Sequence, residues 1–180
     1  MQKNMLEYNR YFVKNQLHTS YFASSKPARR TAILTCMDTR LTHLLTAALG
    51  IKDGDAKIIR NAGGTLLDEY DTTIRSLLVA ILEFDISYLD VIGHTDCGVS
   101  KISSASLIDK LYSRGISPSS CQEFAGQCPA FEHWFSGFSN VEEEVIQTVK
   151  LLKNHPLMPK DICIQGYLMD IDTGELSPLI

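Results

Sequence analysis

Three potential metal ligands lie at the ends of two apolar segments of this sequence. Cys36 closes the apolar run 31–36, and His94 and Cys97 follow the run 88–93. Two thiolates and one imidazole form a ligand set that zinc uses in catalytic sites, where water or substrate takes the fourth position. A single cysteine in an apolar strand is usually only a small core residue, and a single histidine is usually only a hydrogen-bonding group. Because both strand ends carry such ligands, we interpret the three residues as one zinc site.

Two charged residues, Asp38 and Arg40, follow directly after Cys36. An aspartate beside a metal site can accept a hydrogen bond from a water bound there. A nearby arginine can form two hydrogen bonds with that carboxylate and keep it ionised. Asp38 could instead bind the zinc itself, which would close the fourth position and give an inactive state, and an ordinary surface ion pair is a third interpretation. We expect Asp38 and Arg40 to be catalytic residues.

The order of the predicted elements explains how distant ligands could meet. Short apolar runs indicate buried strands, and a period of about 3.6 residues indicates helices. Alternating strands and helices argue for parallel pairing with right-handed crossovers, and such sheets usually bind ligands at the carboxyl ends of their strands. The three ligands therefore converge if the first and third strands are neighbours. We expect strands at 31–36, 56–60, 88–93 and 162–169, and helices at 4–22, 41–49, 68–84 and 140–152.

A turn with two glycines follows the second predicted strand, at Ala62, Gly63 and Gly64. Glycine permits positive φ and a close approach of the backbone to other groups. This turn is either a plain strand-to-helix connection or a backbone wall around a small anion, and we expect it to form part of the substrate pocket. The spacing matches neither a dinucleotide fingerprint nor a phosphate-binding loop.

The predicted fold class is α/β. We expect a three-layer α/β/α domain with a mostly parallel central sheet of four strands, a short C-terminal edge strand after the turn 172–174, and an N-terminal helical arm. The length fits one domain, residues 1–180, of which 1–25 form the arm. The arm is apolar enough to need a partner surface, either on its own domain or on a second subunit, and the sequence leaves both open.

The segment 98–139 is predicted to contain several short helices, broken near 115–118 and at Pro129. Two cysteines in this segment, Cys121 and Cys128, do not have a usual zinc-ligand spacing. Cys163 lies in a predicted strand and is expected in the core.

Composition excludes several classes of protein. The chain is 44% hydrophobic and 21% charged, with a net charge of −4, so it lacks the basic footprint of a nucleic-acid-binding protein. No apolar run approaches the length of a membrane span, and the first residues do not resemble a signal peptide. We expect a cytoplasmic protein without disulfides that binds neither nucleic acid nor membrane.

The sequence resembles the β-class carbonic anhydrases, most closely their short subgroup in bacteria and archaea. Two motifs carry the resemblance: Cys-Met-Asp-Thr-Arg at 36–40 matches the family's Cys-x-Asp-Ser/Thr/Ala-Arg, and His-Thr-Asp-Cys at 94–97 matches its His-x-x-Cys. The segments 60–64 and 166–176 also match. The resemblance runs from about residue 30 to the C-terminus and weakens between 101 and 139.

This resemblance implies a zinc enzyme, with one Zn²⁺ per subunit, that reversibly hydrates carbon dioxide to bicarbonate and a proton through a zinc-bound hydroxide. It implies Cys36, His94 and Cys97 as zinc ligands, and Asp38 with Arg40 as the pair that orients the attacking group. It also implies a homodimer or larger homo-oligomer, which favours an arm laid on a second subunit. No residue can be assigned as a proton shuttle from the sequence.

Two alternatives share these ligands. One is a hydrolase of another small linear molecule, such as carbon disulfide or carbonyl sulfide, for which a long apolar tunnel would be expected. A short cleft near Asp38 would argue against that hydrolase. The other is a catalytically silent zinc protein or sensor whose fourth zinc position is permanently filled by Asp38.

Overall fold

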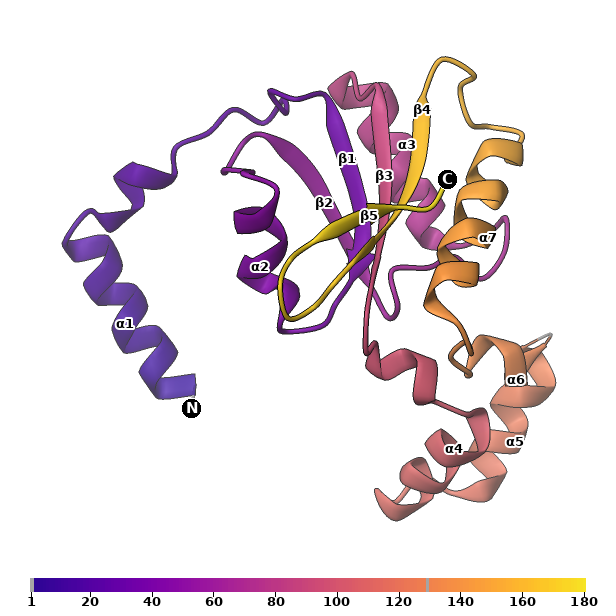
Figure 1. Cartoon of the computed structure of the whole chain (residues 1–180). Helices are drawn as coiled ribbons and strands as arrows, with labels where there is room; N and C mark the ends of the chain where they lie inside the picture. The colour runs from indigo at the N-terminus through magenta and orange to yellow at the C-terminus, as the bar shows by residue number, and fades with distance from the viewer. Residues whose placement is uncertain (1, 129) are drawn as a thin grey trace.

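The sheet that organises the molecule has five strands. The computed structural model describes residues 2–128 and 130–180 of the chain. The strands lie in the order β2-β1-β3-β4-β5 (Figure 1), with β1 to β4 parallel and β5 antiparallel to β4, so the predicted mostly parallel sheet with a short edge strand is confirmed. The strands are β1 (Thr31–Cys36), β2 (Ala56–Asn61), β3 (Tyr88–His94), β4 (Cys163–Met169) and β5 (Leu176–Pro178).

Helices cover both faces of this sheet, as the three-layer prediction requires. On one face, α3 (Thr72–Phe84) and α7 (Val141–Asn154) bury apolar residues of β1, β3 and β4. On the other face, α2 (Leu41–Ala48) packs its Leu41 and Leu45 against the sheet in a second core, which also contains two cysteines of the predicted zinc site. The remaining helices are α1 (Gln2–Lys14), η1 (Leu17–Tyr21), η2 (Gly98–Lys101), α4 (Ser104–Ser113), α5 (Pro118–Gln127) and α6 (Phe131–Trp134).

Two helix predictions need correction. The helix predicted at 68–84 begins only at Thr72, because the carboxylate of Asp71 accepts a hydrogen bond from the N–H of Thr73 at 2.7 Å and caps the helix there. The helix predicted at 4–22 ends at Lys14. Gln16 adopts a left-handed conformation with φ of 55°, which interrupts the helix before the 3₁₀ turn η1.

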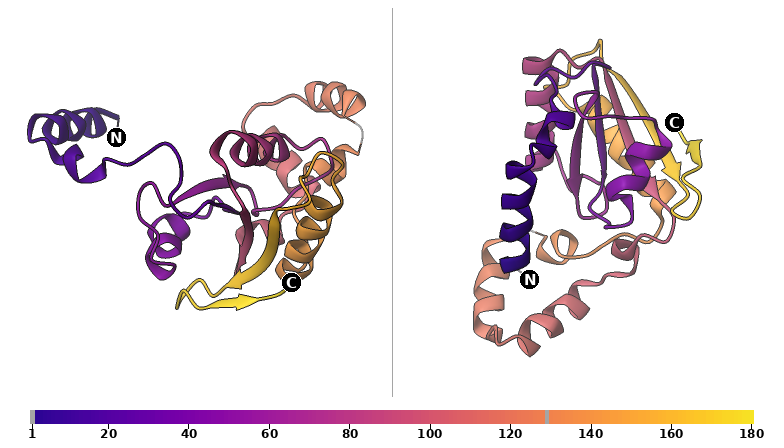
Figure 2. Two further views of the ribbon diagram at one scale, coloured as in Figure 1. Left: turned by 90° about the horizontal axis from the view of Figure 1, so that it is seen from above. Right: turned by 90° about the vertical axis from the view of Figure 1, so that its left-hand side faces the viewer.

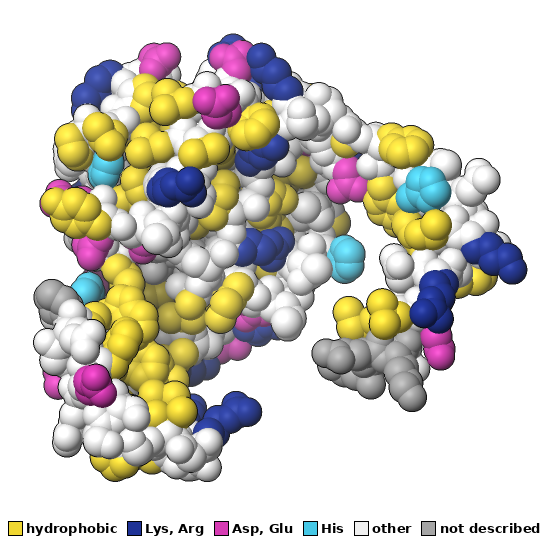
Figure 3. Space-filling model, turned by 180° about the vertical axis from the view of Figure 1, so that it is seen from behind, with side chains coloured by type: hydrophobic (Ala, Val, Ile, Leu, Met, Phe, Trp, Pro, Cys, Tyr) yellow, Lys and Arg dark blue, Asp and Glu magenta, His cyan; other side chains and the backbone are white. Residues whose placement is uncertain are grey.

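The N-terminal arm projects from the domain (Figures 1 and 2). Its apolar side chains are exposed, with Tyr8 64% and Phe22 78% accessible. The helices α4 to α6 form a second projection, on which an aromatic cluster that includes Phe124 and Trp134 is also half-exposed. Figure 3 shows hydrophobic side chains gathered over this projection at the lower left, with the arm at the right. Both projections therefore present apolar surface to solvent.

The predicted core position of Cys163 is wrong. Burial alternates along β4, where Ile164 and Gly166 pack toward α7 while Cys163 and Gln165 are exposed on the opposite face.

The break predicted near 115–118 is confirmed by the gap between α4 and α5, and the one at Pro129 falls outside the described residues. None of the helices within 2–128 and 130–180 has the length and apolar character needed to cross a bilayer.

Candidate metal centre

The three predicted ligands converge because β1 and β3 are adjacent in the sheet. Thr35 pairs with Ile92, so Cys36 and His94 both emerge at the carboxyl edge. The sulfur atoms of Cys36 and Cys97 and a ring nitrogen of His94 all lie within 4.8 Å of one another. The three side chains are at most 2% exposed, so the cluster is shielded from solvent.

A tight turn after β3 brings Cys97 back toward His94. Asp96 takes a positive φ of 50°, which is uncommon for a residue other than glycine and marks a sharp reversal of the chain. Thr95 anchors this turn to the end of β4, because its N–H donates to the carbonyl of Met169 at 3.0 Å and its hydroxyl oxygen accepts from the N–H of Ile171 at 2.9 Å. The position of Cys97 is therefore fixed by hydrogen bonds to the neighbouring strand.

The ring of His94 is oriented as a metal ligand would be. Its Nδ1 lies 2.9 Å from the carbonyl oxygen of Thr95, which can only accept, so Nδ1 carries the hydrogen and donates it. Nε2 is buried and has no hydrogen-bond partner in the part of the chain that the structure describes. A buried nitrogen lone pair without a partner is costly, and a metal ion beside it would remove that cost.

The two sulfur atoms are 3.8 Å apart. Tetrahedral zinc with Zn–S bonds of about 2.3 Å places its two sulfur ligands about 3.8 Å from each other, so the spacing fits this ion. The thiols also share one proton, because the thiol of Cys97 stabilises the thiolate of Cys36 by a hydrogen bond. This bond lowers the pKa of Cys36 and raises the pKa of Cys97. A divalent cation that replaces the shared proton would be held by two thiolates.

Arg40 ties the two ligand-bearing loops together beside the cluster. Its Nε and a terminal nitrogen donate to the two carboxylate oxygens of Asp38 at 3.1 and 2.9 Å, and this pairing holds the pKa of Asp38 at about 2. The same guanidinium donates to the side chain and the carbonyl of Asp96 at 3.2 and 3.0 Å. Sequence reasoning missed Asp96, although it lies inside the His-x-x-Cys motif, because only the fold brings it to Arg40.

Asp38 is held away from the position of a ligand in this conformation. Its Oδ2 lies 3.9 Å from Nε2 of His94, and both of its carboxylate oxygens accept hydrogen bonds from Arg40. Asp38 therefore lies next to the cluster but outside the group of three ligand atoms.

The glycine turn after β2 supports the cluster more than it lines a pocket. Gly64 has φ of +70°, and a Cβ there would lie 2.7 Å from the backbone N of Cys36. Gly63, with φ of +87°, packs on the ring of Phe138, and of the three predicted pocket residues Ala62 lines the neighbouring cavity. The side chain of Asn61, also missed by sequence reasoning, fixes the turn: its amide donates to the carbonyl of Thr65 and to the hydroxyl of Thr73, and its Oδ1 accepts from the N–H of Thr65.

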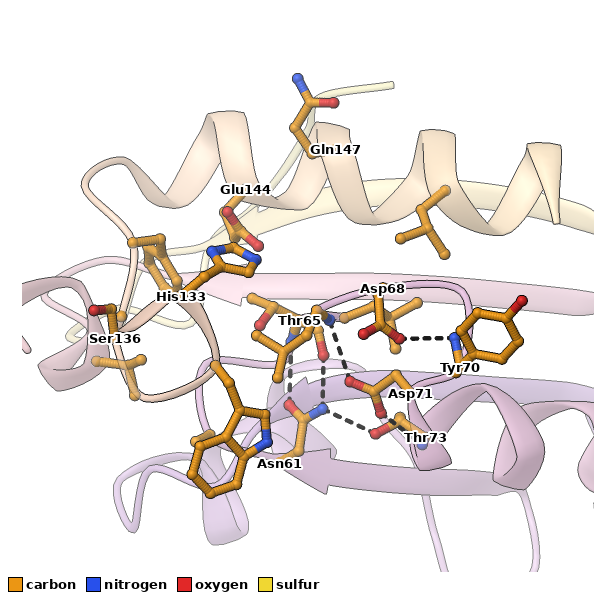
Figure 4. A pocket seen from close by; sticks show the side chains of 18 of the residues that line it. Asn61, Thr65, Asp68, Tyr70, Asp71, Thr73, His133, Ser136, Glu144 and Gln147 are labelled. Atoms are coloured by element: carbon orange, nitrogen blue, oxygen red, sulfur yellow. Dashed lines mark hydrogen bonds between the residues drawn. The ribbon is translucent and has the colours of Figure 1, made fainter. Parts of the chain in front are cut away.

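A cavity between the β2–α3 loop and α7 has a volume of about 980 Å³. It lies between the segment 61–73 and the segments 133–138 and 144–154, and several polar side chains line it (Figure 4). Val99 and Phe138 line this cavity and also pack against the core that contains Cys36 and Cys97. None of Cys36, His94 and Cys97 lines the cavity itself.

The fold is a mostly parallel α/β sheet, and a buried cluster of two cysteines and one histidine lies at its carboxyl edge. These two features define a class of α/β proteins whose site has the ligands that zinc prefers. Within that class, the family model described as carbonic anhydrase matches residues 31–176. The chain therefore belongs to the carbonic anhydrase family, and the resemblance to the β-class enzymes is confirmed.

Several known proteins are similar along most of the chain. The protein YvdA of Bacillus subtilis, whose name assigns a carbonic anhydrase function provisionally, is 37% identical over 177 residues, covering 98% of this chain and 90% of YvdA. The crystal structure of β-carbonic anhydrase isoform I from Trichomonas vaginalis superposes with a TM-score of 0.91 at 29% identity, covering 100% and 97% of the two chains. A carbon disulfide hydrolase of Acidithiobacillus thiooxidans is 32% identical over 158 residues, covering 83% of this chain and 77% of the hydrolase.

Proposed function

We propose that this protein catalyses the zinc-dependent, reversible hydration of carbon dioxide to bicarbonate and a proton. The observation that carries the proposal is the buried Nε2 of His94, which has no hydrogen-bond partner among residues 2–128 and 130–180. It lies beside two thiols 3.8 Å apart and next to an aspartate held by an arginine. Family membership supports the same reaction.

Each of the predicted ligands and catalytic residues has a role in the proposed reaction. Cys36, His94 and Cys97 hold the zinc, which when bound supplies Lewis-acid activation of water. Asp38 accepts a hydrogen bond from the attacking group and thereby directs a lone pair toward carbon dioxide. Arg40 keeps Asp38 ionised and oriented, because it forms two hydrogen bonds with that carboxylate.

A carbon disulfide hydrolase is the second candidate, since a relative of 32% identity carries that name. A route for carbon disulfide is expected to be a long apolar tunnel. The cavity between the β2–α3 loop and α7 has a mixed lining instead, with apolar side chains such as Leu66, Val99 and Phe138 and polar ones such as Asp71, His133 and Glu144. This cavity is therefore not a continuous apolar tunnel. The catalytically silent alternative is disfavoured because both oxygens of Asp38 are engaged by Arg40.

The proposal includes a cytoplasmic homodimer. A cytoplasmic location would keep the thiols of the site reduced. The exposed apolar side chains of the arm and of the projection α4 to α6 together form a surface that a second copy could bury. Sedimentation of the full chain at micromolar concentration should show a dimer or larger species, and a stable monomer would contradict this part.

Stopped-flow measurement of carbon dioxide hydration on zinc-replete protein, from about pH 6.5 to 9, tests the reaction. Two thiolates neutralise the zinc charge, so the site acidifies water weakly and the rate should rise toward alkaline pH. Release of hydrogen sulfide from carbon disulfide is measured in parallel. Hydrolysis of carbon disulfide without hydration of carbon dioxide would overturn the proposal, and so would the absence of both activities with zinc bound.

A further inference from the structure

The guanidinium of Arg40 is shared between two carboxylates, and only that of Asp38 has a role in the proposed reaction. Its Nε and Nη2 donate to the two oxygens of Asp38. The other terminal nitrogen, Nη1, donates to Oδ2 of Asp96 at 3.2 Å, and Nη2 also donates to the backbone carbonyl of Asp96. The Asp96 side chain is therefore a direct partner of the arginine that holds Asp38.

The second carboxylate oxygen of Asp96 is held from η2. Nζ of Lys101 lies 2.6 Å from Oδ1 of Asp96. The helix η2 starts directly after the ligand Cys97, whose carbonyl accepts hydrogen bonds from the N–H and the hydroxyl of Ser100. The carboxylate of Asp96 thus bridges two cations, one on each of its oxygens.

The contact with Asp96 fixes Arg40 relative to the second ligand loop. The side chain of Arg40 is 43% exposed, so nothing packed around it prevents it from changing its orientation. Asp38 lies only two residues away on the same loop, and the two could turn together as one planar pair. A guanidinium held on a further edge by a residue next to Cys97 cannot turn in this way. Oδ2 of Asp38 is thereby kept 3.9 Å from Nε2 of His94.

The turn alone does not explain an acidic residue at position 96. Asp96 has φ of 50°, a left-handed conformation that glycine adopts without strain and that asparagine also tolerates. The turn is already anchored to β4 through the N–H and the hydroxyl of Thr95. What aspartate adds to this turn is the pair of contacts that its carboxylate makes with Arg40 and Lys101.

We infer that Asp96 is a positioning residue for the hydration of carbon dioxide, which acts through Arg40 to hold the carboxylate of Asp38 beside the metal and off it. The inference rests on the proposed function. Asp96 does not touch the substrate, and Lys101 holds Asp96 in turn. Without the carboxylate of Asp96, the pair of Arg40 and Asp38 is free to turn toward the cluster, where an oxygen of Asp38 takes the fourth position and stops the reaction.

Two variants remove the charge of Asp96 and keep the turn. Asp96→Gly and Asp96→Asn both accept the left-handed conformation, and both retain the backbone carbonyl that Arg40 contacts. At one fixed pH, Asp96→Gly should lower kcat/KM for hydration about 10-fold, the lower end of the loss seen when an outer partner of a metal site is removed. Asp96→Asn should lose less, because its amide oxygen can still accept from Arg40. Both variants should bind zinc fully, since the three ligands are unchanged.

A spectroscopic measurement reports the position of Asp38 without turnover. In the cobalt(II)-substituted protein, the visible absorption spectrum depends on which groups bind the metal. Asp96→Gly should shift this spectrum, because a carboxylate oxygen enters the fourth position. The double variant Asp96→Gly, Asp38→Asn should return to the spectrum of Asp38→Asn alone. A merely structural role of Asp96 would not give this reversal.

Asp85 provides a matched control. It also has a positive φ, of 60°, and its carboxylate also contacts two cations, Lys26 and Arg30. It precedes β3, whereas the cluster lies at the far end of that strand. Asp85→Gly should therefore leave kcat/KM and the cobalt spectrum unchanged. Lys101→Met should lower kcat/KM less than Asp96→Gly does, because the contact between Asp96 and Arg40 remains.

Two results would overturn the inference while the proposed function stands. The first is wild-type kcat/KM with a wild-type cobalt spectrum in both variants of Asp96. The second is loss of zinc from both variants, since Asp96 would then support the ligand loop and not Asp38. If the wild type does not hydrate carbon dioxide, the proposed function fails. The cobalt spectra of the variants still decide whether Asp96 keeps Asp38 off the metal.

Discussion

Replacing Gly64 by alanine should damage the metal centre from outside its ligand set. Gly64 has φ of +70°, and an added Cβ would lie 2.7 Å from the N of Cys36, and 2.7 Å and 3.0 Å from two backbone atoms of Thr35. These atoms belong to the end of β1 and cannot swing aside as a flexible side chain could. Either the turn or the strand end that carries Cys36 must move.

A matched variant separates backbone strain from steric overlap. Gly50 has φ of +59° and no atom within 4 Å of an added Cβ, so Gly50→Ala carries only the cost of a left-handed conformation, about 1–2 kcal/mol. Gly64→Ala carries the same cost plus that of overpacking, a further ~1–3 kcal/mol. For a domain of this size each kcal/mol lowers Tm by about 2–4 °C.

The test is to measure the Tm of thermal unfolding and the zinc content of both variants. Gly64→Ala should have a Tm lower than that of Gly50→Ala by at least roughly 2 °C, and only Gly64→Ala should lose zinc affinity, because its relaxation displaces Cys36. Equal Tm values for the two variants, together with full zinc binding by Gly64→Ala, would refute the idea that the glycine turn supports the cluster.

Three further predictions concern the side chains of the site. Cys97→Ser should lose zinc, because a hydroxyl is a poor replacement for a thiolate, while Cys163→Ser should retain it since Cys163 is exposed outside the cluster; a full zinc complement in Cys97→Ser would exclude Cys97 as a ligand. Asp38→Asn should keep zinc and lose most turnover, and wild-type rates would remove Asp38 from the mechanism. Arg40→Gln should destabilise the zinc-free protein more above the pH at which Asp38 becomes protonated than below it, because only the hydrogen bond from Arg40 to the backbone carbonyl of Asp96 is independent of pH. The folded pKa of Asp38 is about 2, below its ordinary value, so the pair stabilises the fold fully above about pH 4 and loses this contribution as the pH falls toward 2. Urea unfolding at several pH values should therefore show the two proteins converging at acid pH, and a constant difference would contradict the role of this pair.

The local pattern of the sequence determined most of the secondary structure. The apolar runs correctly predicted the central strands β1 and β3, because strands buried in a parallel sheet need continuous hydrophobic residues. The predicted strands at 56–60 and 162–169 also formed, as β2 and β4. The predicted helix boundaries were wrong where a single backbone angle or cap decides them. At Gln16 the chain turns left-handed, and at Asp71 a carboxylate captures the N–H of Thr73. The error at Cys163 has a different cause, since periodicity does not tell which face of a strand a helix will cover.

For the site, the sequence by itself determined the types of the ligands and their positions at strand ends, and two motifs were enough to predict Cys36, His94 and Cys97 as one cluster. Only the tertiary structure decided that β1 and β3 are neighbours, which brings residues more than 50 positions apart within 4.8 Å. It also decided that Asp96 binds Arg40 and that His133 and Glu144 face one cavity. Arg40 and Asp96 are 56 positions apart, and His133 and Glu144 lie on two different helices. Their proximity therefore depends on the order of the strands and the path of the chain between them, which local sequence does not encode.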